Sequence, residues 1–291
     1  MLHPLARSPL CAAARPRPRA ALLGAHRALG AGAASSTTAS LSPREGLPRW
    51  PGLTTPTGCL RTLDWAGTVV FSMSGSLTAA TSGCDLLGAM AVGSITALGG
   101  GTIRDAVILR VVPFWVEEWE YIVMAALAAG GVFFLWGNLE PGREVLPGLV
   151  LKRADGGEGN LMALGDALGL GAFAAVGAMN GIRAAAPPLV SAICGLSTCT
   201  FGGVMRDTLL NRPVRILHSY SDMYATIAFG GAVGYLGLRA LAPAAQGLRI
   251  AACVSGVVGA RYMAWNDDWR LPYWKGKTVV HSDLDPRKKQ K

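Results

Sequence analysis

Long stretches without charged residues constrain this chain more than any other feature. The first, residues 65–84, has the roughly twenty residues that a helix needs to cross a bilayer. One or two such runs could be buried helices of a soluble core, but a succession of six or seven predicts a polytopic membrane protein. The expected spans are residues 65–84, 86–103, 121–139, 167–182, 184–205, 223–238 and 250–260.

The composition agrees with a membrane environment. Of the 291 residues, 51% are hydrophobic and only 15% are charged, whereas about a quarter of an ordinary soluble domain is charged. The net charge of +9 resides at the two ends, with +5 in residues 1–45, +5 in residues 270–291 and −1 between them. A nucleic-acid-binding protein would need a basic face on its folded body. We therefore expect a lipid bilayer and no nucleic acid as partner.

The N-terminal segment has the composition of an organellar targeting sequence. It is rich in Arg, Ala and Ser, and its first acidic residue is Glu45. This composition is typical of a transit peptide, and the alternative is a disordered basic tail. We expect residues 1–55 to lie outside the fold and to direct the protein to a mitochondrial or plastid inner membrane. The basic tail, residues 265–291, is expected outside the fold as well.

The chain contains an internal repeat. When it is shifted against itself by 102 residues, segments 64–110 and 166–212 align without a gap and are identical at twelve positions. The matches include Asp64 with Asp166, and Arg104–Asp105 with Arg206–Asp207. Charged residues in register are not expected by chance from two apolar segments. We infer a duplication.

An odd number of spans in each copy fixes the topology of the duplication. Three spans per repeat make the second copy enter the membrane from the opposite side, and inverted repeats place their binding sites near the bilayer midplane. The predicted fold is therefore an all-α polytopic membrane protein with seven transmembrane helices. Its parts are two inverted three-helix repeats, residues 60–140 and 163–240, and a seventh helix, residues 247–264.

A glycine-rich motif ends the second span of each repeat. The first copy is GGGTIRD, residues 99–105, and the second is FGGVMRD, residues 201–207. We expect the glycines to break the second and fifth helices, because irregular backbone at membrane depth is tolerated where it lines a cavity. A helix that restarts presents a positive dipole end to a carboxylate, and the unwound carbonyls and acidic side chains suit an ammonium or metal cation. The predicted site comprises Gly99, Gly100, Gly101, Arg104, Asp105, Gly202, Gly203, Arg206 and Asp207.

The buried charges allow two interpretations. Charged residues inside a membrane usually pair and line a pathway, so each Arg–Asp motif could be a structural clamp, a ligand contact, or both. Neighbouring residues of a helix do not face each other. We therefore expect each arginine to meet the other repeat's aspartate or a cavity, and Asp64 and Asp166 to cap span starts.

Two three-span repeats that each carry GG-x-x-R-D, followed by a seventh span, resemble the glycine transporter domain family. In the second copy Phe201 stands for the first glycine and Val204 for Thr102. The resemblance implies two copies of that domain. It also implies a relation in fold to the trimeric intracellular cation (TRIC) channels, which kink the same two spans at glycines.

Two functions follow as alternatives. The first is transport of a small zwitterion, for which the resemblance suggests glycine, through a midplane site. The second is a TRIC-like channel for monovalent cations, and a homo-oligomer, such as a trimer, is the expected assembly. The sequence has no nucleophile–base pair, no lysine of a phosphate-binding loop, and six cysteines without metal-ligand spacing. We predict no enzyme activity, no cofactor and no metal.

Overall fold

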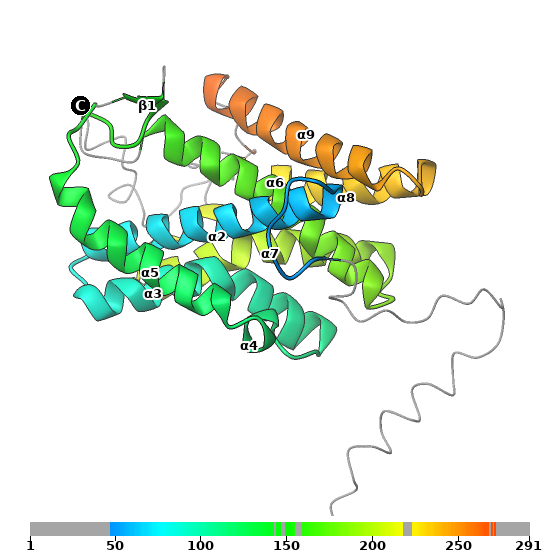
Figure 1. The fold of residues 1–291 in the computed structure, drawn as a ribbon, viewed down its shortest axis with the longest axis horizontal. Helices are drawn as coiled ribbons and strands as arrows, with labels where there is room; N and C mark the ends of the chain where they lie inside the picture. The colour runs from blue at the N-terminus through cyan, green and yellow to red at the C-terminus, as the bar shows by residue number, and fades with distance from the viewer. Residues whose placement is uncertain are drawn as a thin grey trace, which may run out of the picture. The chain divides into compact units, whose positions relative to one another are not determined.

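The computed structural model describes residues 47–142, 144–146, 149–154, 159–217, 223–267, 269 and 271. The proposed targeting sequence, up to residue 46, and the tail beyond residue 271 lie outside the described residues. The described part is almost entirely helical, as predicted (Figure 1). The exception is a short antiparallel pair of strands between the repeats, β1 (Glu144–Leu146) and β2 (Leu149–Val150).

Each repeat contributes three long helices. The first has α2 (Pro56–Thr81), α3 (Leu86–Thr102) and α5 (Glu120–Leu135), and the second has α6 (Asn160–Arg183), α7 (Pro188–Leu209) and α8 (Ala225–Leu241). The last helix is α9 (Gln246–Asn266). Short turns join them: the π-helix η1 (Ile103–Leu109), α4 (Phe114–Glu117), and the 3-10 turns η2 (Trp136–Asn138) and η3 (Arg215–Leu217).

Local signals explain where several helices begin. Thr55 caps α2 by accepting a hydrogen bond from the backbone N–H of Gly58, and Pro56 occupies the first helical position. Asp85 caps α3 in the same way through Gly88. Pro188 opens α7, where the N–H that proline lacks would have no partner. These residues set the helix starts before any tertiary contact is made.

Within the part of the chain that the structure describes, three helical segments are long and apolar enough to cross a membrane: Leu86–Leu109, Asn160–Arg183 and Pro188–Leu209. The helices α5 and α8 are apolar but shorter. The structure thus supports several spans, while the count of seven stays a prediction.

The helices α2 and α6 pack together in the middle of the helical body. Their backbones approach closely at the Gly67–Gly169 pair, where a Cβ added to either residue would lie 3.0 Å from the Cα of the other. Figure 1 shows α8 and α9 beside α6, and α3 and α5 beside α2. Small residues permit this close approach of backbones, as is usual for membrane helices.

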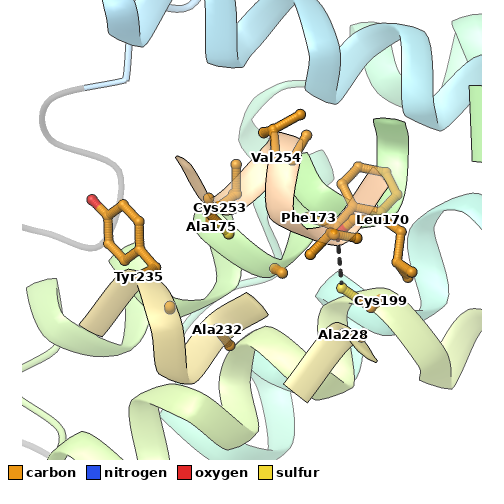
Figure 2. Packing of buried hydrophobic residues seen from close by; sticks show 14 of the residues in the cluster. Leu170, Phe173, Ala175, Cys199, Ala228, Ala232, Tyr235, Cys253 and Val254 are labelled. Carbon is orange, nitrogen blue, oxygen red and sulfur yellow. Dashed lines mark hydrogen bonds between the residues drawn. The ribbon is translucent and has the colours of Figure 1, made fainter. Parts of the chain in front are cut away.

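The hydrophobic core surrounds α6, and 67% of the apolar stretch of this helix is buried inside the protein. Figure 2 shows Leu170 and Phe173 of α6 among residues of α7, α8 and α9. The thiol of Cys199 on α7 donates to the carbonyl of Leu170. On the other side, the hydroxyls of Ser72 and Ser76 on α2 donate to carbonyls of α5. Lipid tails are as apolar as helix side chains, so the hydrophobic effect does not drive membrane helices together. Hydrogen bonds between helices, such as these, help to hold the bundle together.

The predicted glycine breaks are not what the structure shows. The helix α3 continues through Gly99–Gly101 and widens only afterwards into the π-helix η1, and α7 stays α-helical through Gly202 and Gly203. Each glycine lowers helix propensity by about 1 kcal/mol relative to alanine, but unwinding in an apolar interior would leave backbone groups without partners. The glycines serve close packing instead. A Cβ on Gly100 would collide with the carbonyls of Ser197 and Thr198 on α7.

Candidate functional site

Two small pockets adjoin the charged motifs of the two repeats. The first, called here the α3 pocket, has a volume of about 40 Å³. It is lined by residues of α2, α3, η1, α6 and α7, among them Asp64, Arg104, Asn180 and Thr198. The second, the α7 pocket, has a volume of about 30 Å³ and is lined among others by Thr96, Asp166, Gly203, Arg206 and Asp207.

The repeat relates the two pockets to each other. Adding 102 to the number of a residue in the α3 pocket often gives a residue of the α7 pocket, as with Asp64 and Asp166, or Arg104 and Arg206. Each pocket also borrows residues from the other repeat: Thr198 lines the α3 pocket, and its counterpart Thr96 lines the α7 pocket. The lining residues therefore fall into two pockets, each built from both repeats. A binding site near the bilayer midplane stays a prediction.

Two phenylalanines at equivalent positions of the two repeats each line one pocket. Phe71 of α2 lines the α7 pocket, and its counterpart Phe173 of α6 lines the α3 pocket. The two ring centroids are 5.2 Å apart. Along α2 and α6 the lining residues run in opposite order, with Asp64 and Asn180 in one pocket and Ser74 and Asp166 in the other. The two helices are therefore antiparallel, and each pocket is lined by one ring of the pair.

The arginine of the first motif binds the aspartate next to it. The Nε of Arg104 donates to Oδ1 of Asp105 at 2.8 Å, and its Nη2 donates to Oδ2 at 3.0 Å. Its Nη1 donates across the repeats to Oγ1 of Thr198 at 3.3 Å. Asp105 also accepts the backbone N–H of Phe114, because the chain folds back after η1. The pair is almost fully buried, with 4% and 3% of its side chains exposed.

The second motif repeats this arrangement. The Nε of Arg206 donates to Oδ1 of Asp207 at 2.8 Å, and its Nη2 lies 2.7 Å from the same oxygen. Of the two expected surroundings of each arginine, the structure shows the cavity, since Arg104 and Arg206 each line a pocket. Each arginine pairs with the aspartate next to it and not with that of the other repeat. Neighbouring residues of a helix do not face each other because their Cα–Cβ bonds point in different directions. The arginine side chain is long enough to return to the adjacent carboxylate, even on the regular α-helix of α7.

A further charged cluster adjoins the α3 pocket. The Tyr121 hydroxyl donates to Oδ2 of Asp64, and Nη1 of Arg61 donates to the Tyr121 oxygen at 2.8 Å. Arg61 also reaches Glu118 at 2.5 Å and Oδ2 of Asp64 at 3.5 Å. Asp64 thus lies inside α2 and is not the cap that the sequence suggested, since Thr55 and Pro56 start the helix two turns earlier. Its partners allow the charge to be buried.

A related Asp–Tyr–Arg cluster adjoins the α7 pocket. The Tyr224 hydroxyl donates to Oδ1 of Asp166 at 3.2 Å, which matches the Tyr121–Asp64 bond. Asp166 likewise lies within α6 and is not a cap. The cation here is Arg261 of α9, whose Nη2 lies 3.8 Å from Oδ2 of Asp166 and whose guanidinium carbon is 4.9 Å from the Tyr224 ring centroid. The sequence argument missed these tyrosines and arginines because they lie outside the aligned segments or have no counterpart in the other copy.

The glycines of the predicted site take different positions. Gly101 and Gly203 line the two pockets, whereas Gly100 and Gly202 pack against carbonyl groups of the opposite repeat. Gly99 faces the sulfur of Met205. Among the described residues, no group of three or more His, Cys, Asp or Glu side chains could hold a metal ion.

The sequence profile of the glycine transporter family matches residues 61–137 and again residues 163–240. The chain belongs to the glycine transporter family. The two matches fall on the two repeats that the charged motifs revealed.

The relatives of this chain include three bacterial membrane proteins described as UPF0126 proteins. They are YadS of Escherichia coli K12 (33% identical over 59% of this chain and 74% of the relative), a protein of Deinococcus radiodurans (30%, 60% and 73%) and YvgT of Bacillus subtilis (31%, 72% and 94%).

Solved structures of TRIC channels share the fold of this family member. One, described in a study of conductance through TRIC cation channels, is 28% identical and aligns with a TM-score of 0.64 over 75% of this chain and 98% of the channel. The TRIC orthologue of Rhodobacter sphaeroides is 30% identical, with a TM-score of 0.60 over 72% and 98% of the two chains. The protein is therefore a multi-pass integral membrane protein with a TRIC-like fold, of a transporter or channel type.

Proposed function

We propose that this protein moves a small zwitterion, with glycine as the first candidate, across a membrane through the α3 and α7 pockets. The observation that carries the proposal is the paired arrangement of half-sites. Each pocket is lined by the arginine of one Arg–Asp motif and by one ring of the Phe71–Phe173 pair. Buried charged groups that line a cavity in a membrane protein mark a solute pathway.

The antiparallel packing of α2 and α6 supports a pathway that opens toward both faces. In our proposal the two repeats are inverted within a seven-span topology, so that each pocket faces one side of the membrane. Movement of one repeat against the other would then open the half-sites in turn, as in carriers built from inverted repeats. The site residues in this proposal are Arg104, Asp105, Arg206 and Asp207, with Gly99–Gly101, Gly202 and Gly203 as packing and lining positions.

A specific observation favours a second candidate, a channel for monovalent cations. The α3 pocket has a volume of about 40 Å³, which is room for about three water-sized groups. A glycine molecule has five non-hydrogen atoms, so this pocket would have to widen to admit it, whereas a partly dehydrated monovalent cation would fit. The similarity to TRIC channels, together with their trimeric assembly, supports this alternative as well.

The two candidates differ in what purified protein does in vesicles. We propose to measure uptake of labelled glycine and flux of potassium in the same proteoliposomes, with protein-free vesicles as the control. A carrier shows saturable glycine uptake that accelerates when unlabelled glycine is present inside. A channel shows unitary potassium currents and no glycine exchange. Absence of both activities would contradict a transport function for either solute.

We further propose that the membrane is that of an organelle and that residues 1–55 supply the targeting signal. The support is the composition of the segment, which is rich in arginine and has no acidic residue before Glu45.

A further inference from the structure

The α3 pocket contains a buried amide whose oxygen has no partner. Asn180 of α6 lines this pocket and is only 6% exposed. Its Oδ1 has no hydrogen-bond partner among the residues that the structure describes. A buried acceptor without a donor is costly, and native structures rarely retain one unless a ligand, ion or water completes it.

The carboxylate of Asp64 adds a second acceptor to the same small pocket. Both Tyr121 and Arg61 contact Oδ2 of Asp64. The lone pairs of its other oxygen, Oδ1, are therefore available to a further donor. Asp64 and Asn180 line the same pocket, whose volume is about 40 Å³.

The balance of charge around this pocket favours a cation. Two guanidinium groups, Arg61 and Arg104, line the pocket together with the carboxylates of Asp64 and Glu118. A third carboxylate, that of Asp105, does not line the pocket but is paired with Arg104. Two positive and three negative charges leave a net charge of −1. Each guanidinium is engaged by a carboxylate at 2.5 to 2.8 Å, which limits its repulsion of a bound cation.

The α7 pocket does not offer the same environment. Arg206, Asp166 and Asp207 line it, and Arg261 is paired with Asp166 from outside the lining. Counted in the same way as for the α3 pocket, with ion-pair partners included, these charges of the described residues sum to zero. The position equivalent to Asn180 is Thr78, whose hydroxyl already donates to the carbonyl of Ser74 in its own helix. The repeat is therefore chemically asymmetric at this position.

We propose that Asn180 and Asp64 form a subsite in the α3 pocket for an ammonium group or a monovalent cation. This inference rests on the proposed transport function and names the part of the solute that the α3 pocket holds. In a bound zwitterion the ammonium group lies between the two acceptors.

Binding of three probes to the purified full chain in detergent tests the subsite. Glycine carries both charges, methylammonium carries only the positive one, and acetate carries only the negative one. For Asn180→Leu, which removes the acceptor at similar volume, we expect glycine and methylammonium to bind about tenfold more weakly, as for the loss of a hydrogen bond to a charged group. Acetate binding stays unchanged. Asn180→Asp strengthens methylammonium binding, because it adds a negative charge to the acceptor.

The matched control is Thr78→Val, which removes a hydroxyl at the equivalent position of the other repeat and leaves all three affinities unchanged. Thermal midpoints show whether each variant is folded. If Asn180→Leu does not fold, Asn180→Ser, with its shorter reach, provides the same comparison. Unchanged methylammonium binding in the folded Leu or Ser variant would overturn the subsite.

The outcomes for the subsite and for the proposed function are separable. If the wild-type protein carries glycine but Asn180→Leu binds it with wild-type affinity, the subsite is wrong and the function stands. If the wild-type protein carries no glycine but methylammonium binding depends on Asn180, glycine transport is wrong and the cation subsite stands.

Discussion

The aromatic ring of Phe71 lies against that of Phe173, its counterpart in the other repeat, with 5.2 Å between the centroids. Each ring lines the pocket whose arginine belongs to the opposite repeat. In the proposed pathway, we expect a solute that passes from one pocket to the other to displace this pair, so that the two rings form its barrier.

Removal of both rings is expected to open that barrier. In the double variant Phe71→Ala/Phe173→Ala, potassium flux through proteoliposomes should rise above the wild-type level. Glycine, if it is carried, should then cross without any acceleration by unlabelled glycine inside the vesicles. The control is Phe134→Ala on α5, because Phe134 is 62% exposed and lines neither pocket. Each core substitution costs about 3–5 kcal/mol, so Phe→Leu at both positions provides a milder test. Unchanged flux in folded double variants would argue against a barrier at this position.

The Arg104–Asp105 pair allows a test of clamp against contact. Arg104→Ala leaves a buried carboxylate without its partner, and we expect a loss of about 3–5 kcal/mol in stability together with loss of transport. The informative variant is Arg104→Met with Asp105→Asn, which removes both charges. We expect it to regain most of the thermal midpoint but not the transport rate. Wild-type transport by this double variant would show that the pair serves only structure.

The close packing of Gly100 on α7 predicts a sharp effect of a single methyl group. Gly100→Ala places a Cβ against the carbonyls of Ser197 and Thr198, so α3 and α7 must move apart and the thermal midpoint should fall. The control is Gly131→Ala on α5, where nothing lies within 4 Å of the added atom. That substitution should be neutral or stabilising by up to about 1 kcal/mol. Equal midpoints for the two variants would contradict the packing role.

Arg261 is expected to stabilise the docking of α9. Its side chain is 4% exposed, but its partner Asp166 is 26% exposed, so solvent weakens the effect of the loss. We expect Arg261→Ala to lower stability by about 2 kcal/mol and Arg261→Lys to recover part of it. The control is Arg239→Ala, at an exposed position of α8. Detergent-solubilised protein heated stepwise and assayed by size exclusion gives the comparison, and equal loss in Arg239→Ala would refute a specific role.

The targeting proposal is tested separately from the fold. A fluorescent reporter fused to residues 1–60 should enter mitochondria or plastids, because the segment is rich in arginine and its only acidic residue is Glu45. A reporter fused to residues 47–60 is the matched control and should stay in the cytosol. A cytosolic or secreted full-length fusion would contradict the proposal.

The sequence predicted the helical repeats because charged residues in register, such as Asp64 and Asp166, are rare in apolar segments. It could not predict the path of the backbone at Gly100, because propensity alone says that glycine weakens a helix and says nothing of the carbonyls packed against it. The pairing of Arg104 with its own neighbour depends on side-chain reach, which a spacing rule does not contain. Asn180 carried no signal at all, since a missing hydrogen bond is visible only once the surroundings are known.

The arginine next to Asp166 comes from α9 and not from the second repeat, and this limits how the two repeats could be recombined. In the first repeat the arginine at the Asp–Tyr pair, Arg61, belongs to the repeat itself, whereas the second repeat obtains Arg261 from α9. The two copies are therefore not interchangeable modules. A fusion of two first repeats would be self-sufficient in charge and could dispense with α9, but a fusion of two second repeats would need one additional helix for each copy.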